Sequence, residues 1–237
     1  MVCKTWVRDS FEVDEEWNFV IQTKTQVKYQ GAKKMKILRE SSENEMILEF
    51  LKAESTSERF SQQIKRTMEK LDINENVVFS PNLQSKIENM QRKKLLGEFR
   101  GYGLGKDLFE NFPTHFPEWY LCSFSSSDLD KIRYIDYSYW NELSAGTHKP
   151  LVAAETIRRG VLIYDLSNDG FLRTAEYIKN GGTFPKLFFL TYDYENFVIV
   201  EGHFRMTAYA LVPENFNDVE VIVGKCDRAE LSLWMLI

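Results

Sequence analysis

The chain has 237 residues, of which 43% are hydrophobic and 14% aromatic, and it carries a net charge of −5. This composition predicts a globular protein of one large or two ordinary domains. No uncharged apolar run of about 18 residues occurs, and the first residues, MVCKTWVRDSF, lack a hydrophobic signal region. We therefore expect a cytoplasmic protein without a membrane span. Cys3, Cys122 and Cys226 are predicted to be free thiols, because they are odd in number and far apart.

The first hundred residues change from alternation to helical spacing. The stretch EWNFVIQTKTQVKYQ alternates, which predicts a short strand pair within the first forty residues. Ser42 then precedes Met46, Ile47, Phe50 and Leu51 at helical spacing, and Glu45 completes the pattern of a capping box. Further helices are predicted over 57–71 and 82–96, so residues 42–97 should be mainly helical.

A stretch rich in Gly, Pro and aromatic residues follows. The segment GYGLGK, residues 101–106, resembles a phosphate loop only superficially, since Gly101 and Gly105 are separated by three residues and Asp107 follows Lys106. We interpret it as a turn after a helix, and the residues up to Phe124 as an irregular connection. The serine-rich SFSSSDLD predicts a domain boundary, which divides the chain into 1–125 and 126–237.

The remaining chain alternates between strand and helix patterns. The pattern predicts an alternating segment KIRYIDYSYW, a helix over 151–159, a strand VLIYDL, a helix FLRTAEYIKN closed by two glycines, strands KLFFL and NFVIV, a helix FRMTAYAL halted by Pro213, and a strand DVEVIV. This order is typical of a compact α/β or α+β unit.

Side chains for metal binding or nucleophilic catalysis are sparse. The histidines are His115, His148 and His203, and none has a partner at the spacing of a zinc site. No G-x-S-x-G elbow occurs either. We therefore predict no metal site.

The stretch VIVEGHFRMTAYAL, residues 198–211, contains the most specific pattern. Gly202, His203 and Arg205 lie where a predicted strand becomes a predicted helix. The free N–H groups of a helix start favour an anion, and the planar guanidinium of Arg suits phosphate. The residues alone leave two interpretations open. Either Arg205 and His203 converge on an anion, or Arg205 pairs with a surface carboxylate and His203 caps the turn.

Together with RTAEYIKNGGTFPKLFFL, the motif VIVEGHFRMTAY resembles the ParB/sulfiredoxin superfamily over roughly residues 128–237. Members show a helix, a Gly and a Pro, then a hairpin ending in an acidic residue, Gly and Arg, and a helix with Ala. The resemblance implies an α+β protein: a mostly helical N-terminal region of residues 1–125, then a ParB/sulfiredoxin-like α/β domain with a small mixed sheet over 126–237.

In that superfamily the motif binds nucleotide phosphates: CTP in partition proteins, ATP in sulfiredoxin and ADP in a free-serine kinase. The resemblance implies that Gly202, His203 and Arg205 line a phosphate pocket, with Glu201 as a base or metal contact. The ligand would be a nucleoside triphosphate with Mg²⁺, which the protein either only binds or also uses as an NTPase or phosphotransferase. His203 and Phe204 stand where sulfiredoxin has its Cys, and no helix-turn-helix follows. Peroxiredoxin repair and chromosome partition are therefore not expected.

The alternative is a binding module for nucleic acid or protein. Residues 59–106 hold ten Lys and Arg against five Asp and Glu, whereas residues 107–237 are acidic. Phosphate backbones are bound through Lys and Arg, so Arg92, Lys93 and Lys94 are the candidate contacts. In this interpretation the ParB-like fold would be only a scaffold.

Overall fold

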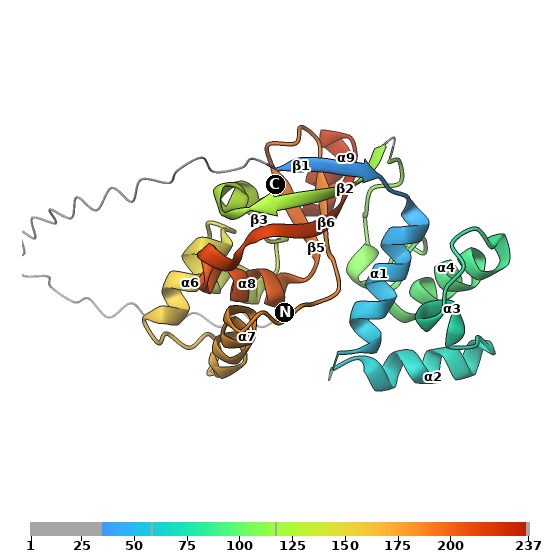
Figure 1. The fold of residues 1–237 in the computed structure, drawn as a ribbon, viewed down its shortest axis with the longest axis horizontal. Helices are drawn as coiled ribbons and strands as arrows, with labels where there is room; N and C mark the ends of the chain where they lie inside the picture. Colours follow the sequence, from blue (N-terminus) through green and yellow to red (C-terminus); the bar gives the residue numbers. More distant parts are fainter. Residues whose placement is uncertain (1–34, 58, 117, 236–237) are drawn as a thin grey trace, which may run out of the picture. The chain divides into compact units, whose positions relative to one another are not determined.

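Six strands form one mixed sheet in the computed structural model, which describes residues 35–57, 59–116 and 118–235 (Figure 1). The strand order is β1-β2-β6-β4-β5-β3. The pairs β4–β6 and β3–β5 are parallel, and the other three neighbouring pairs are antiparallel. The strands are β1 (Lys36–Glu40), β2 (Glu118–Ser125), β3 (Ile132–Arg133), β4 (Leu187–Thr191), β5 (Phe197–Glu201) and β6 (Asn217–Lys225).

One face of the sheet is covered by helices from the first half of the chain. They are α1 (Glu43–Ser55), α2 (Ser61–Leu71), α3 (Asn76–Phe79) and α4 (Lys86–Arg100). Their apolar side chains share a core with Phe188, Leu190 and Val198 of the sheet. The short 3₁₀ helix η1 (Asp107–Phe109) and the C-terminal helix α9 (Arg228–Met235) also contribute to this core.

The opposite face is covered by helices from the second half (Figure 1). They are α5 (Ser138–Leu143), α6 (Pro150–Arg158), α7 (Asp169–Lys179) and α8 (His203–Leu211), with 3₁₀ helices η2 (Ser126–Lys131) and η3 (Pro213–Asn215). Phe189 and Ile199 point to this second core. Because both faces are covered, β4 is buried throughout, which explains its uninterrupted apolar sequence.

The structure confirms the expected mixture of helices and a mixed sheet. Of the capping box expected at Ser42, it confirms one of the two hydrogen bonds. Ser42 Oγ accepts the Glu45 N–H at 3.2 Å, so Ser42 caps α1. The Glu45 carboxylate, however, bonds Arg39 at 2.6 Å and Ser41 at 2.9 Å instead of completing the box. The predicted helices at 57–71 and 82–96 begin about one turn later than expected.

Three expectations about strands and loops are wrong. Residues 118–125, expected to be irregular, form β2 between β1 and β6. Residues 161–166, expected to be a strand, form only the isolated bridge Ile163–Leu166, with Leu162 and Leu166 exposed. The alternating segment after Lys131 pairs only over Ile132–Arg133 before α5 begins. The strand pair expected within residues 16–30 lies outside the described residues.

The boundary expected at residue 125 falls at the end of β2. Strands β1 and β2 precede it, and β2 pairs along its length with β6 near the C-terminal end. All described residues belong to one compact unit that begins at Ala32. The helical region and the α/β region therefore share a sheet.

Cys122 and Cys226 are free and buried, whereas Cys3 lies outside the described residues. Throughout the described part of the chain, no helix is both long enough and apolar enough to span a membrane.

Candidate functional site

The turn between β5 and α8 has the backbone that the sequence predicts. Glu201 ends β5, Gly202 has φ = 99°, and His203 begins α8. A Cβ at position 202 would overlap with Cδ2 of Leu187, and left-handed backbone is strained for other residues. Gly202, the N-cap residue of α8, has no side chain that could bond the N–H groups of the first turn, and its own N–H bonds the Glu201 carboxylate.

Arg205 extends from the first turn of α8 and already has two partners. Its guanidinium forms an ion pair with Glu201 and donates a hydrogen bond to the Pro185 carbonyl oxygen. Only 11% of the Arg205 side chain and 18% of the Glu201 side chain are exposed. The guanidinium is therefore fixed beside the helix start, where a phosphate would compete with Glu201 for it.

His203 lies in an aromatic stack instead of acting as a cation. Its ring stacks on Trp140 with centroids 5.4 Å apart and on Tyr134 at 6.0 Å. Burial lowers the pKa of His203 to about 3, so the ring is neutral at pH 7. Its Nε2 is buried without a hydrogen-bond partner among the described residues. Any contact with an anion would therefore be a neutral hydrogen bond.

Phe204 covers the other side of this helix start. Its ring stacks on Phe171 of α7 with centroids 4.4 Å apart and remains 42% exposed. The two helices approach closely here, since a Cβ at Gly170 would lie 3.1 Å from Phe204 Cζ. The apolar stack fixes the start of α8 against α7.

Glu54, in the last turn of α1, is a member of the site that the sequence analysis missed. It is only 6% exposed. Burial, followed by the nearby charge of Glu201, raises the pKa of Glu54 to about 7, opposed by Arg100, Arg205 and Arg59. The pKa of Glu201 is also raised by burial, while Arg205 opposes the shift. Two carboxylates with raised pKa values thus lie within Coulomb range of Arg100 and Arg205.

A signal for Glu54 is present in the sequence. It follows the buried Phe50 and Leu51 by four and three residues, which places it on the apolar face of α1. A carboxylate on a buried helix face is rare unless it is paired or functional. The partners of Glu54, in contrast, come from distant segments and could not be read from helical spacing.

The three candidate nucleic-acid contacts on α4 differ in their exposure to solvent and in their partners. Arg92 is fully buried, and its guanidinium donates to the carbonyl oxygens of Val77 at 2.6 Å and Asn82 at 3.2 Å. This placement corrects the expectation for Arg92, since those bonds hold α3 and the following loop against α4. Lys93 pairs with Glu43 at 2.9 Å. Lys94 is exposed.

In the part of the chain that the structure describes, the β5–α8 turn holds no cluster of metal-ligating side chains, and residues 201–205 do not line the cavities near Pro185 and near Glu43. No group of three or more His, Cys, Asp and Glu side chains is placed to hold a metal ion in residues 35–57, 59–116 and 118–235. A cavity of about 480 Å³ lies beside Pro185 and Leu187, but residues 201–205 do not line it. The site is thus a helix start with a fixed guanidinium and two protonatable carboxylates.

Comparison with known proteins does not extend this description. No protein-family model matches the chain, and searches of curated proteins and of solved structures find no match either. The interpretation of the site therefore depends on its own geometry and on the resemblance of its sequence motif.

Proposed function

We propose that the protein binds the phosphates of a nucleoside triphosphate at the turn of residues 201–205. The observation that carries this proposal is the uncapped start of α8, with the Arg205 guanidinium fixed beside it. Backbone N–H groups and the helix dipole favour an anion, and Arg adds charge-assisted hydrogen bonds. Gly202 supports the proposal, because its positive φ lets the chain turn from β5 into α8 and so brings Arg205 beside the helix start.

The order of elements also supports assignment to the ParB/sulfiredoxin group. Helix α7, the Gly181–Pro185 loop, strands β4 and β5 and helix α8 follow one another as in the motif of that group. Arg205 bonds the carbonyl oxygen of Pro185, so it links the two halves of the motif. On that basis we propose that the segment belongs to this group.

Glu201 and Glu54 supply the acid–base chemistry of the proposed site. A bound phosphate that replaces Glu201 as the partner of Arg205 would place a new negative charge beside the carboxylates of Glu201 and Glu54. Like charges raise carboxylate pKa values, so binding should be coupled to proton uptake. The same carboxylates are the hard oxygen ligands that Mg²⁺ prefers, and Mg²⁺ would neutralise part of the phosphate charge. Product formation would distinguish phosphotransfer or hydrolysis from binding alone.

A thermal-shift panel of nucleotides, with and without Mg²⁺, tests the proposal. A ligand at a hundred times its dissociation constant adds about 2.7 kcal/mol to the free energy of unfolding. We expect a shift for the wild type that is lost in Arg205→Gln.

Arg158→Gln is the matched control for this panel. Arg158 donates to the carbonyl oxygens of Ala210 and Leu211, at the other end of α8. This variant perturbs the same helix but leaves its start unchanged, so the nucleotide shift should persist. A shift that survives in a folded Arg205→Gln protein would contradict the proposal.

A further inference from the structure

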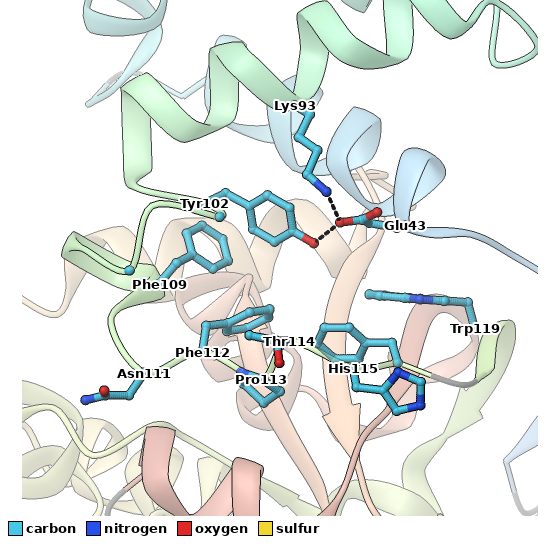
Figure 2. A pocket seen from close by; sticks show the side chains of 13 residues that line it. Glu43, Lys93, Tyr102, Phe109, Asn111, Phe112, Pro113, Thr114, His115 and Trp119 are labelled. Atoms are coloured by element: carbon cyan, nitrogen blue, oxygen red, sulfur yellow. Dashed lines mark hydrogen bonds and ion pairs between the residues drawn. The ribbon is translucent and has the colours of Figure 1, made fainter.

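A second and larger cavity lies away from the β5–α8 turn, at the start of α1. It has a volume of about 700 Å³, within the range of small-molecule sites. Glu43, Lys93 and Tyr102 lie together on one wall, and Phe112 and Thr114 lie across from them (Figure 2). The cavity thus combines a polar wall with an aromatic one.

The polar wall presents a donor and an acceptor side by side. Oε1 of Glu43 accepts hydrogen bonds from the Tyr102 hydroxyl at 2.6 Å and from Lys93 Nζ at 2.9 Å. Burial and the hydrogen bond to Glu43 raise the pKa of Tyr102, so its hydroxyl stays protonated and donates. Among the described residues, Oε2 of Glu43 has no partner, and Lys93 has N–H groups to spare.

The aromatic wall is a chain of packed rings. The ring of Phe112 packs edge-on against Phe109 at 4.8 Å and against Trp234 of α9 at 5.1 Å. Phe116 and Trp119 continue the chain, with centroids 4.8 Å apart. Phe112 also packs against Tyr102 with ring centroids 6.0 Å apart, so the aromatic and polar walls meet at these two rings. A flat apolar ligand would pack on the part of the rings that lines the cavity.

Hydrogen bonds to helix α9 fix the segment that carries the aromatic wall, so the wall is formed without a ligand. Glu230 Oε2 accepts the backbone N–H of Thr114 at 3.1 Å, and Trp234 Nε1 donates to the Leu108 carbonyl oxygen at 3.1 Å. A preformed site does not have to order its walls on binding, which favours affinity.

The charges of the wall restrict the chemical class of the ligand. Lys93 already neutralises Glu43, and its ammonium lies 5.7 Å from the centre of the Tyr102 ring. A cationic ligand would be repelled by Lys93, which already occupies this aromatic face. An anionic ligand would meet the free oxygen of Glu43. A neutral molecule with an N–H donor next to an acceptor can donate a hydrogen bond to Glu43 and accept one from Lys93.

We propose that this cavity binds a neutral, planar amino-heteroaromatic compound, of the kind represented by nucleobases and pterins. Its amino group donates to Oε2 of Glu43, its ring nitrogen or carbonyl oxygen accepts from Lys93, and its ring packs on the Phe112 side of the cavity. This site is separate from the proposed phosphate site, because none of residues 201–205 lines the cavity.

Free 2-aminopurine is a direct probe, since it has the required edge, carries no phosphate, and loses fluorescence when it stacks. We expect the full-length protein to quench it saturably at concentrations below about 1 mM. Purine, which lacks the amino group, should bind about tenfold more weakly, because a hydrogen bond to a charged acceptor is lost. Absence of saturable binding to the folded protein would overturn the proposal, and so would tighter binding of trimethylphenylammonium than of 2-aminopurine.

Paired variants assign the binding to this cavity. Glu43→Ala should weaken 2-aminopurine binding about tenfold or more. Lys93→Met should also weaken it, while Lys94→Met, on the neighbouring exposed lysine, should not. Arg205→Gln should leave the affinity unchanged, which separates this test from that of the phosphate site. Equal affinity in wild type and a folded Glu43→Ala protein would overturn the assignment, and so would loss of binding in a folded Arg205→Gln protein alone.

Discussion

Two ion pairs at helix starts, Glu201–Arg205 and Glu43–Lys93, differ in their surroundings. The first lies at the start of α8 with side chains 18% and 11% exposed, whereas the second lies at the start of α1 with side chains 39% and 51% exposed. An exposed pair contributes little to stability, while removal of one partner from a buried pair leaves an uncompensated charge. The same pairing of a carboxylate with a cation should therefore stabilise the fold more strongly at the start of α8 than at the start of α1.

The largest effect is expected on removal of Arg205. In Arg205→Ala, the buried Glu201 carboxylate loses its counter-ion and must be ionised without a partner or take up a proton. We expect the free energy of unfolding at pH 7 to fall by about 3 to 5 kcal/mol, measured by urea denaturation. The double variant Glu201→Gln/Arg205→Gln should recover part of this loss. A loss below 1 kcal/mol in Arg205→Ala would show that the pair behaves as an exposed one.

Burial of Glu54 should make the free energy of unfolding depend on pH. Its pKa rises from 4.5 to about 7 on folding, so the folded state holds a proton that the unfolded state releases. The stabilising contribution is complete below pH 4.5 and is lost as the pH rises to about 7, and Glu201 acts in the same direction. The loss amounts to about 3 kcal/mol for Glu54, since one pKa unit corresponds to about 1.4 kcal/mol.

Glu54→Gln should remove most of this pH dependence, measured as urea stability between pH 4.5 and 7.5. Glu49→Gln, on the same helix, is the control, because Glu49 already has a counter-ion in Lys52 at 2.9 Å. It should keep the pH dependence of the wild type. A Glu54→Gln protein that keeps it as well would show that Glu54 is ionised in the fold.

A smaller effect is expected at Gly202. Gly202→Ala places a Cβ in left-handed backbone and against Leu187 Cδ2. We expect a loss of about 2 kcal/mol in thermal or urea unfolding. Gly146→Ala is the control, because Gly146 also has φ > 0 but a Cβ there would meet no atom within 4 Å. If both variants lose the same amount, backbone strain alone accounts for the effect and Leu187 does not crowd the turn.

The smallest effect on stability is expected at the exposed pair. Lys93→Ala should lower the free energy of unfolding by no more than about 1 kcal/mol, and less at high salt. Urea denaturation at low and high ionic strength measures this. A loss as large as that in Arg205→Ala would remove the contrast between the two helix starts.

Local sequence patterns predicted many of the helices and strands, but they did not predict which charged side chains are buried. The cap at Ser42 and the strand–Gly–helix turn at Gly202 depend on neighbouring residues, so sequence spacing was sufficient for both. Arg92 reads as part of a basic run, yet it is buried because α3 and the loop before α4 fold over it. Residues 161–166 alternate like a strand but form only the isolated bridge Ile163–Leu166 among the described residues.

The most direct test of the phosphate site is an amide NMR titration of the full-length protein with inorganic triphosphate. The account predicts saturable shifts of the backbone N–H signals of His203, Phe204 and Arg205, stronger at pH 6 than at pH 8 because Glu54 is then more protonated. Saturable shifts elsewhere, with these three amides unchanged, would contradict the central claim that the start of α8 binds phosphate.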